Sequence, residues 1–180
     1  MVYEPSEDSF LLEKEIKNYL SKLKDKNINV LDMGSGSGIQ AKACIKAGIK
    51  RSKVLAADID KEAIKILKKK GLKAVKTNLF SNIKERFNLI IFNAPYLPED
   101  DLEKGIDTTA GEKGYEIIIK FLEQAKVHLK PQGKILLLFS SLSRPEVILN
   151  YAKTQGYKYK KLAEQKLFFE KLFVYEFSID

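Results

Sequence analysis

The sequence predicts an α/β fold whose seven-stranded sheet is mostly parallel, carries helices on both faces and ends in an antiparallel hairpin. Short apolar runs alternate with amphipathic helical segments along most of the chain. The first apolar run leads through a glycine-rich turn into a helix, as in a βα unit. The last two β-like runs follow each other without an intervening helix, which favours an antiparallel pair.

The predicted elements follow one another as a βα repeat. An amphipathic helix over residues 9–24 comes first, with its start signal at residues 5–8. We expect the strands at residues 29–33, 53–57, 73–77, 88–92, 134–140, 157–163 and 172–177. We expect the further helices at residues 39–47, 61–70, 117–128 and 145–153, with residues 130–133 closing the third of these.

Length and composition indicate one globular domain over residues 1–180. The chain is 44% hydrophobic, and no apolar run reaches the length of a membrane span. The N-terminus lacks the basic and apolar regions of a signal peptide, so we expect a cytoplasmic protein. Cys44 and His128 are the single residues of their types, so we expect them to be structural and expect no metal site.

A glycine-rich turn, Gly34-Ser35-Gly36-Ser37-Gly38, follows Asp32 and Met33 at the end of the first expected strand. Glycines let the backbone approach a ligand, and the following helix start offers unpaired N–H groups. The spacing G-x-G-x-G is not the G-x-G-x-x-G of a dinucleotide site, and no Gly-Lys-Ser/Thr follows. Asp32 would repel a pyrophosphate but can accept from an α-ammonium group. We therefore expect S-adenosylmethionine, not NAD, with Asp32, Gly34 and Gly36 at the cofactor.

Asp58 ends the second expected strand, 26 residues beyond Asp32. A carboxylate at this place in a βαβ unit can accept from both hydroxyls of a ribose. The structural alternative is capping of the helix over 61–70, a task that Asp60 serves better. At the end of the third expected strand, Asn78 can accept from an adenine amine while Leu79 packs on the ring, unless Asn78 is simply an exposed loop residue.

The fourth expected strand runs into Asn93-Ala94-Pro95-Tyr96. This segment offers a side-chain carbonyl, a main-chain carbonyl and a flat apolar wall, the groups needed to hold an amide or an amino-purine in one orientation. A strand end closed by a turn is the structural alternative, because Asn and Pro both favour turns. Combined with the glycine loop, the segment predicts methyl transfer to a planar nitrogen, with Asn93, Ala94, Pro95 and Tyr96 at the reaction centre.

The stretch from Leu97 to Glu116 is polar, contains three glycines and has no periodicity. A long irregular stretch in a compact domain is usually functional or disordered. Because it follows directly on residues 93–96, we expect it to form a substrate lid, with surface disorder as the alternative.

Four segments carry a resemblance to a known family. They are residues 3–12 (Tyr-Glu-Pro-Ser-Glu-Asp-Ser-Phe-Leu-Leu), 32–38, 58–60 and 93–96. Through them the chain resembles the HemK-like class of S-adenosylmethionine-dependent methyltransferases. It is most similar to the short archaeal and eukaryotic branch, which methylates the glutamine of the GGQ motif in translation release factors. The resemblance covers nearly the whole chain and implies a Rossmann-like seven-stranded methyltransferase sheet.

The resemblance also implies site residues and partners. Carried over by position, the cofactor contacts fall on Ser9, Asp32, Gly34, Asp58, Asn78 and Leu79. Substrate recognition falls on Asn93 and its neighbours, with a release factor as the substrate. Relatives in the short branch work with a small zinc-binding activator protein that covers an exposed strand edge.

Two positions depart from the family pattern. Ala94 stands where the family usually has proline; it keeps the main-chain carbonyl, but the fixed φ of proline is lost. Asn78 stands where the family commonly has Asp, and its amide oxygen can still accept from the adenine amine. Two other functions remain open at this point. One is N-methylation of an exocyclic amine of adenine or guanine in RNA or DNA, and the other is a non-catalytic binding module on the same fold.

Overall fold

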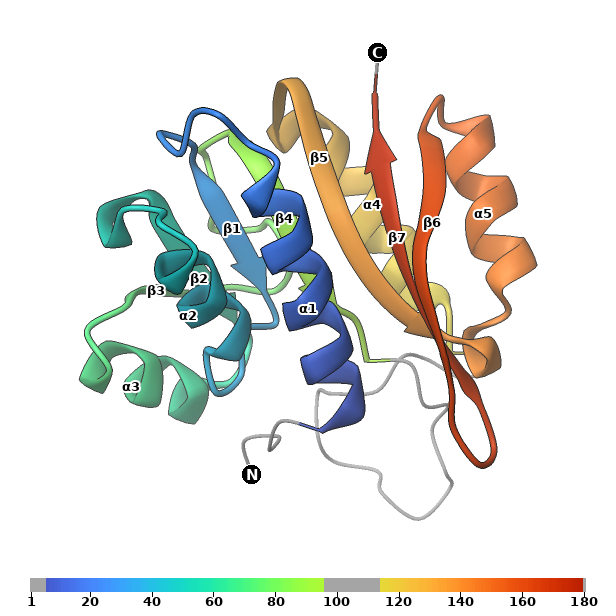
Figure 1. The fold of residues 1–180 in the computed structure, drawn as a ribbon, viewed down its shortest axis with the longest axis horizontal. Coiled ribbons are helices and arrows are strands. Elements are labelled where there is room, and N and C mark those ends of the chain that lie inside the picture. Colours follow the sequence, from blue (N-terminus) through green and yellow to red (C-terminus); the bar gives the residue numbers. More distant parts are fainter. Residues whose placement is uncertain (1–5, 96–113, 180) are drawn as a thin grey trace.

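The computed structural model describes residues 6–95 and 114–179 of the chain. Its centre is one seven-stranded sheet in the order β3-β2-β1-β4-β5-β7-β6 (Figure 1). The strands from β1 to β5 pair in parallel, whereas β7 pairs antiparallel with both β5 and β6. The predicted architecture, a mostly parallel sheet with a C-terminal antiparallel hairpin, is confirmed.

The elements lie close to their predicted positions. The strands are β1 (Val30–Met33), β2 (Val54–Asp58), β3 (Lys73–Lys76), β4 (Phe87–Asn93), β5 (Leu129–Ser140), β6 (Lys158–Lys166) and β7 (Lys171–Ser178). The α-helices are α1 (Glu7–Ser21), α2 (Ile39–Lys46), α3 (Lys61–Lys69), α4 (Glu116–His128) and α5 (Pro145–Thr154). None of the helices within the described ranges is long and apolar enough to cross a membrane.

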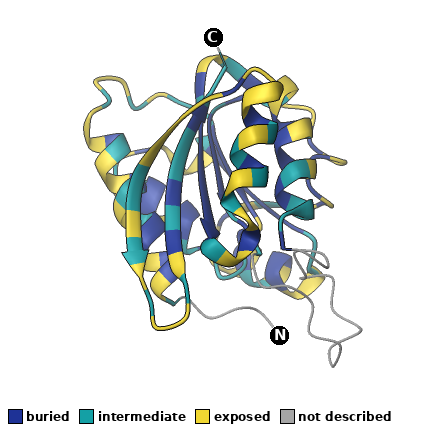
Figure 2. Cartoon of the chain, turned by 90° about the vertical axis from the view of Figure 1, so that its right-hand side faces the viewer, coloured by how far each residue is buried: buried dark blue, intermediate teal, exposed yellow. Residues whose placement is uncertain are grey.

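Helices cover both faces of the sheet, so the central strands are buried on both sides (Figure 2). Every residue of β1 and β2 is buried, as expected for the near-continuous apolar runs of parallel strands. One core cluster joins the sheet to α1, α2 and α3, and the other joins the opposite face to α4 and α5. In a sheet covered on both faces, ligands typically bind at the carboxyl ends of the parallel strands.

Two boundaries differ from the prediction. The helix α1 ends at Ser21 and not at residue 24, and the Lys26 ammonium reaches back to the Leu20 carbonyl at that end. The strand β5 begins at Leu129, because Leu129 pairs with Phe87 before the regular ladder starts. The expected turn at residues 130–133 is therefore a bulge within a longer strand, with Gln132 at a positive φ of 61°.

Candidate functional site

The carboxyl ends of β1 and β4 lie side by side in the middle of the sheet. Met33 is paired with Phe92, so the turn after β1 starts next to Asn93 at the end of β4. After β1 the chain crosses to β2 on one side of this pair, and after β4 it crosses to β5 on the other side. Such a switch in strand order leaves a crevice where ligands bind in open α/β sheets. The first turn of α1 lies near the same edge (Figure 1).

The glycine loop approaches the end of β4 closely. A Cβ added to Gly34, whose φ is +60°, would lie 3.2 Å from the Phe92 ring and 4.0 Å from the Asn93 carbonyl oxygen. Gly38, with φ +83°, is enclosed on the helix side, since an added Cβ would lie 2.7 Å from a methyl carbon of Leu67. Gly36 has open space by comparison, because its nearest neighbour among the described residues is the Gly34 oxygen at 4.0 Å. The loop is thus packed at both ends and accessible in the middle.

Asp32 holds the loop from below and is only 1% exposed. One carboxylate oxygen accepts from the Ser35 hydroxyl at 2.5 Å and from the Ala41 N–H of α2 at 3.0 Å. Burial, opposed by these two hydrogen bonds and reinforced by the charge of Asp58, raises the pKa of Asp32 to about 7. Asp32 thus lies in β1 directly before the glycine loop and organises that loop, while its contact with a cofactor stays a prediction.

Asp58 joins the glycine loop to β2. One oxygen accepts from the Gly36 N–H at 2.8 Å, and the other accepts from the Asp60 N–H at 2.9 Å. The helix α3 is capped by Asp60, whose side chain accepts from the Glu62 N–H at 2.8 Å. Capping is thus not the task of Asp58. Its two oxygens keep lone pairs that can accept from ligand hydroxyls.

Asn78 and Leu79 follow β3 at the same edge. The Asn78 side chain is exposed, while Leu79 is 8% exposed and sits at φ 48°, a region that non-glycine residues rarely occupy. The Thr77 hydroxyl donates to the Leu79 carbonyl at 2.9 Å and supports this conformation. A strained backbone held in place by its surroundings is frequent at ligand sites.

The Asn93 amide is held from one side only. Its Nδ2 donates to Asp8 Oδ2 at 3.0 Å, whereas its Oδ1 is buried and has no hydrogen-bond partner among the described residues. Ala94 is 2% exposed and its N–H donates to the Leu138 carbonyl of β5 at 3.3 Å. Pro95 is half-buried. Tyr96 and the expected lid up to residue 113 lie outside the described residues.

Ser9, in the first turn of α1, is also brought to this edge. It is 3% exposed, and its carbonyl accepts from Gln40 Nε2 of α2 at 2.9 Å. Its neighbour Asp8, which contacts Asn93, is a site residue that sequence reasoning treated only as part of a helix start. The signal that could have found it is a charged residue at the beginning of an apolar helix stripe, next to a segment implied to bind the cofactor.

Two residues expected to be structural lie in structural positions. Cys44 is fully buried in the core. His128 stacks on Phe80, with ring centroids 4.6 Å apart, and its Nδ1 lies 2.9 Å from the Glu85 carbonyl oxygen. Within residues 6–95 and 114–179 no cluster of three or more metal-binding side chains occurs.

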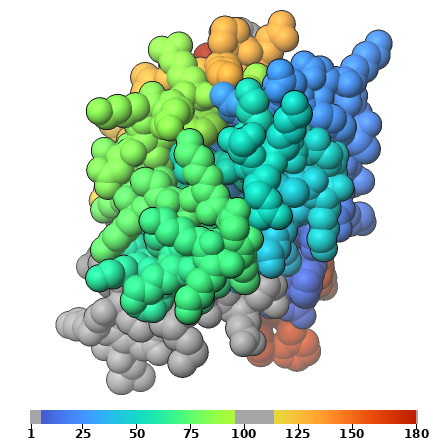
Figure 3. Space-filling view, turned by 90° about the vertical axis from the view of Figure 1, so that its left-hand side faces the viewer, coloured from blue at the N-terminus to red at the C-terminus, as the bar shows by residue number. Residues whose placement is uncertain are grey.

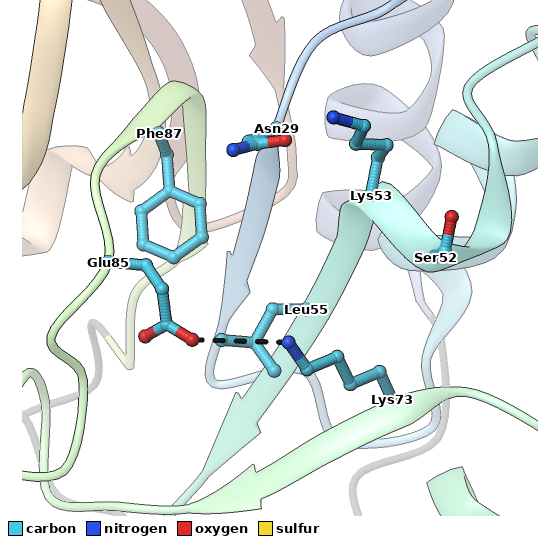
Figure 4. A pocket seen from close by; sticks show the side chains of 7 residues that line it. All are labelled: Asn29, Ser52, Lys53, Leu55, Lys73, Glu85 and Phe87. Atoms are coloured by element: carbon cyan, nitrogen blue, oxygen red, sulfur yellow. Dashed lines mark ion pairs between the residues drawn. The ribbon is translucent and has the colours of Figure 1, made fainter.

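A separate pocket lies at the opposite edge of the sheet. Its lining comes from the amino ends of β1 to β4, with Asn29, Leu55 and Phe87 around a Lys73–Glu85 ion pair of 3.9 Å (Figure 4). The space is about 80 Å³, which is too small for a nucleoside. Its lining shares no residue with the glycine loop or with Asn93, so this pocket is not part of the candidate site.

Comparisons with known proteins agree with this geometry. Residues 12–167 match the model of the methyltransferase small domain family. A protein of Methanocaldococcus jannaschii, described as a candidate protein N5-glutamine methyltransferase, is 35% identical over 96% of this chain and 89% of its own length.

Two solved structures share the fold. The Mtq2 subunit of the E. cuniculi Mtq2–Trm112 complex, described as responsible for methylating the termination factor eRF1, has a TM-score of 0.79 at 24% identity, with 99% of this chain and 98% of that chain covered. The 16S rRNA methyltransferase RsmC of T. thermophilus, in complex with AdoMet and guanosine, has a TM-score of 0.68 at 19% identity, covering 98% of this chain and 44% of that chain. The chain belongs to the methyltransferase small domain family, as its resemblance to the HemK-like methyltransferases implied.

Proposed function

We propose that this protein transfers a methyl group from S-adenosylmethionine to the side-chain amide nitrogen of a glutamine, the glutamine of the GGQ motif in a translation release factor. The observation that carries the proposal is the Oδ1 of Asn93, which is buried next to the glycine loop and has no hydrogen-bond partner in the described part of the chain. A buried acceptor without a partner costs free energy unless a ligand pairs with it. A primary amide is a planar donor that fits such an acceptor.

The residues at the glycine loop fit S-adenosylmethionine better than a dinucleotide. Gly36 leaves room for the close approach of a ligand. Asp32 and Asp58 bring two carboxylates to the loop, and neither has an ion pair with a lysine or arginine in the described part of the chain. Two such carboxylates favour a cationic ligand with ribose hydroxyls and disfavour a pyrophosphate.

Each cofactor contact has a stated role in this proposal. Asp32 faces the α-ammonium group, Gly34 and Gly36 provide the backbone surface, and Asp58 accepts from the ribose. Asn78 and Leu79 hold the adenine, with Leu79 as the apolar wall and Asn78 as the exposed polar rim. Ser9 closes the site from the side of α1.

The chemistry requires little more than alignment and polarisation. When bound, S-adenosylmethionine supplies an electrophilic methyl group on its sulfonium sulfur. Asn93 Oδ1 and the Ala94 carbonyl accept the two N–H groups of the substrate amide, which raises electron density on its nitrogen and fixes its plane. The sequence predicts Pro95 and Tyr96 as the wall against that plane, of which Tyr96 lies outside the described residues. The nitrogen loses a proton to water after transfer, so the mechanism assigns no strong base.

A small partner protein belongs to the same proposal. The sheet has two outer strands, β3 and β6, each paired on one side only. An outer strand is a template for pairing with another chain, and the β3 side of the molecule is the face seen in Figure 3. The fold of the chain is that of Mtq2, which was solved with Trm112. We propose a small zinc-binding activator at one of these edges, and a release-factor substrate would place both proteins in the cytoplasm.

The test is mass spectrometry after incubation with isotope-labelled S-adenosylmethionine, in parallel on a purified release factor and on total RNA, with and without the activator. We expect label on the GGQ glutamine and none on nucleobases. Label found only on an exocyclic amine of adenine or guanine would contradict the proposal. It would show that the protein is a nucleic-acid N-methyltransferase. Cofactor binding without label on either acceptor would instead identify a non-catalytic binding module.

A further inference from the structure

The first turn of α1 and the end of β4 are joined by one hydrogen bond between side chains 85 positions apart. Asn93 Nδ2 donates to Asp8 Oδ2 at 3.0 Å. Asp8 is only 3% exposed although it carries a carboxylate, and its other oxygen accepts from the Ser9 N–H at 2.6 Å. The Ser9 carbonyl in turn accepts from Gln40 of α2 at 2.9 Å, so the turn that carries this carboxylate is fixed to α2.

The chemistry of this pair fixes one of two orientations of the Asn93 amide. Rotation of the terminal amide by half a turn exchanges its oxygen and its NH₂ group while the shape is kept. An ionised carboxylate only accepts hydrogen bonds, so Asp8 can pair with the NH₂ end and not with the oxygen. Oδ1 must then point away from Asp8, and it is this atom that is buried without a partner among the described residues.

We propose that Asp8 is a positioning residue that selects the Asn93 orientation in which Oδ1 accepts from the N–H of the methyl acceptor. This inference rests on the proposed function, since it names the device that makes Asn93 an acceptor there. Without Asp8, the amide could present its NH₂ group instead. A donor in that place would face the N–H of the substrate amide and would not bind it.

Replacement of the carboxylate by an amide tests the proposal. In Asp8→Asn the new side chain still accepts from the Ser9 N–H through its oxygen, so its NH₂ group faces Asn93. Two NH₂ groups cannot pair, and Asn93 turns to offer its oxygen to position 8. We expect turnover to fall on the order of a hundredfold, as when one preorganised hydrogen-bonding group is lost, while the Kd for S-adenosylmethionine is unchanged.

The exchanged pair tests whether the hydrogen bond between positions 8 and 93 carries the effect. In Asp8→Asn/Asn93→Asp, the NH₂ group at position 8 donates to the carboxylate at position 93, whose second oxygen faces the substrate again. We expect the double variant to recover a substantial part of the rate that Asp8→Asn loses. Asn93→Asp alone places two carboxylates opposite each other and is expected to be slow. If the effect of Asp8→Asn did not depend on the hydrogen bond between positions 8 and 93, the double variant would be at least as impaired as each single one.

Glu7→Gln is the matched control. Glu7 lies in the same first turn of α1, but it is exposed and accepts from the Ser6 hydroxyl. Its replacement removes the same charge from the helix N-terminus without touching Asn93. We expect it to retain the turnover of the unaltered protein.

A second readout needs no substrate. In the ¹⁵N–¹H spectrum of the cofactor-bound protein, the Asn93 side-chain NH₂ signal should shift in Asp8→Asn and stay in place in Glu7→Gln. Failure of the unaltered protein to modify a release factor would count against the proposed function, while this readout would still test Asp8. An unmoved Asn93 signal, full turnover of Asp8→Asn, or a double variant without recovery would each overturn the proposal.

Discussion

Asp32 is a buried carboxylate whose protonation affects both the fold and the cofactor site. Its raised pKa of about 7 arises mainly from burial. The folded protein therefore binds this proton more tightly than the unfolded chain does, where the pKa has its ordinary value. The stability that this difference contributes is fully present below that ordinary pKa and is lost as pH rises through about 7.

We expect cofactor affinity to move in the opposite direction. The ionised Asp32 pairs with an ammonium group, so binding of S-adenosylmethionine should tighten as pH rises through about 7, while the cofactor-free protein loses stability over the same range. Urea titrations and calorimetry at several pH values measure both. The variant Asp32→Asn, which can keep the bonds to Ser35 and Ala41, should flatten both profiles near that pH. An unchanged pH dependence in that variant would assign the effect to another group.

For the variant Ala94→Pro, the sequence alone predicts a stiffer loop, whereas the structure adds a loss of stability. Restoring the family residue with Ala94→Pro keeps the carbonyl and stiffens the backbone. The structure adds a cost, because the Ala94 N–H donates to the Leu138 carbonyl at 3.3 Å and proline has no N–H. We expect turnover to be kept while the free energy of unfolding falls by about 1 kcal/mol, as for one lost hydrogen bond. Chemical denaturation and a turnover assay check the two parts, and a loss of turnover with unchanged stability would contradict both.

At the scale of elements, the shape of the site depends on the conformation and packing of the glycine loop that connects β1 to α2. Gly36 and Gly38 both have positive φ, but only Gly38 packs against α3 through Leu67. Gly38 therefore serves the packing of the helices, whereas the Gly36 N–H donates to Asp58 and Gly36 faces the ligand in the proposed function.

This difference is testable with two matched variants. Gly38→Ala and Gly36→Ala share the cost of a side chain at positive φ, about 1 kcal/mol. Gly38→Ala adds a clash at 2.7 Å, so we expect it to lower the free energy of unfolding by roughly 1–3 kcal/mol more than Gly36→Ala does. We expect Gly36→Ala to weaken cofactor binding at modest cost in stability. Equal destabilisation by the two variants in urea titrations would contradict the assignment.

At the scale of the whole molecule, the strand positions and the terminal antiparallel hairpin were predictable, because the central strands β1, β2 and β4 are apolar runs and no helix separates the last two strands. The capping role of Asp60 followed equally from local chemistry, and the structure shows it. The start of β5 was not predictable, since the pairing of Leu129 with Phe87 joins segments 42 positions apart across a bulge. The contact between Asp8 and Asn93 was not predictable for the same reason. Neither segment contains a local sequence signal for pairing with the other.

The carboxyl edge of the sheet combines two separable parts. In the proposed function, the glycine loop with Asp32 and Asp58 faces the cofactor, and the end of β4 with Asn93 faces the acceptor. Their separation is the central claim of the proposed function, since Asn93 Oδ1 has no hydrogen-bond partner among the described residues. A change at Asn93 should therefore affect the reaction without affecting cofactor binding.

The most direct test measures both quantities in Asn93→Ala. Calorimetry should give a Kd for S-adenosylmethionine close to that of the unaltered protein, because Asn93 is not a cofactor contact in this account. Turnover on the release-factor glutamine should fall on the order of a hundredfold or more, as when one preorganised hydrogen-bonding group is lost. Full turnover in Asn93→Ala, or a loss of cofactor affinity that accounts for the whole decrease in rate, would contradict the account.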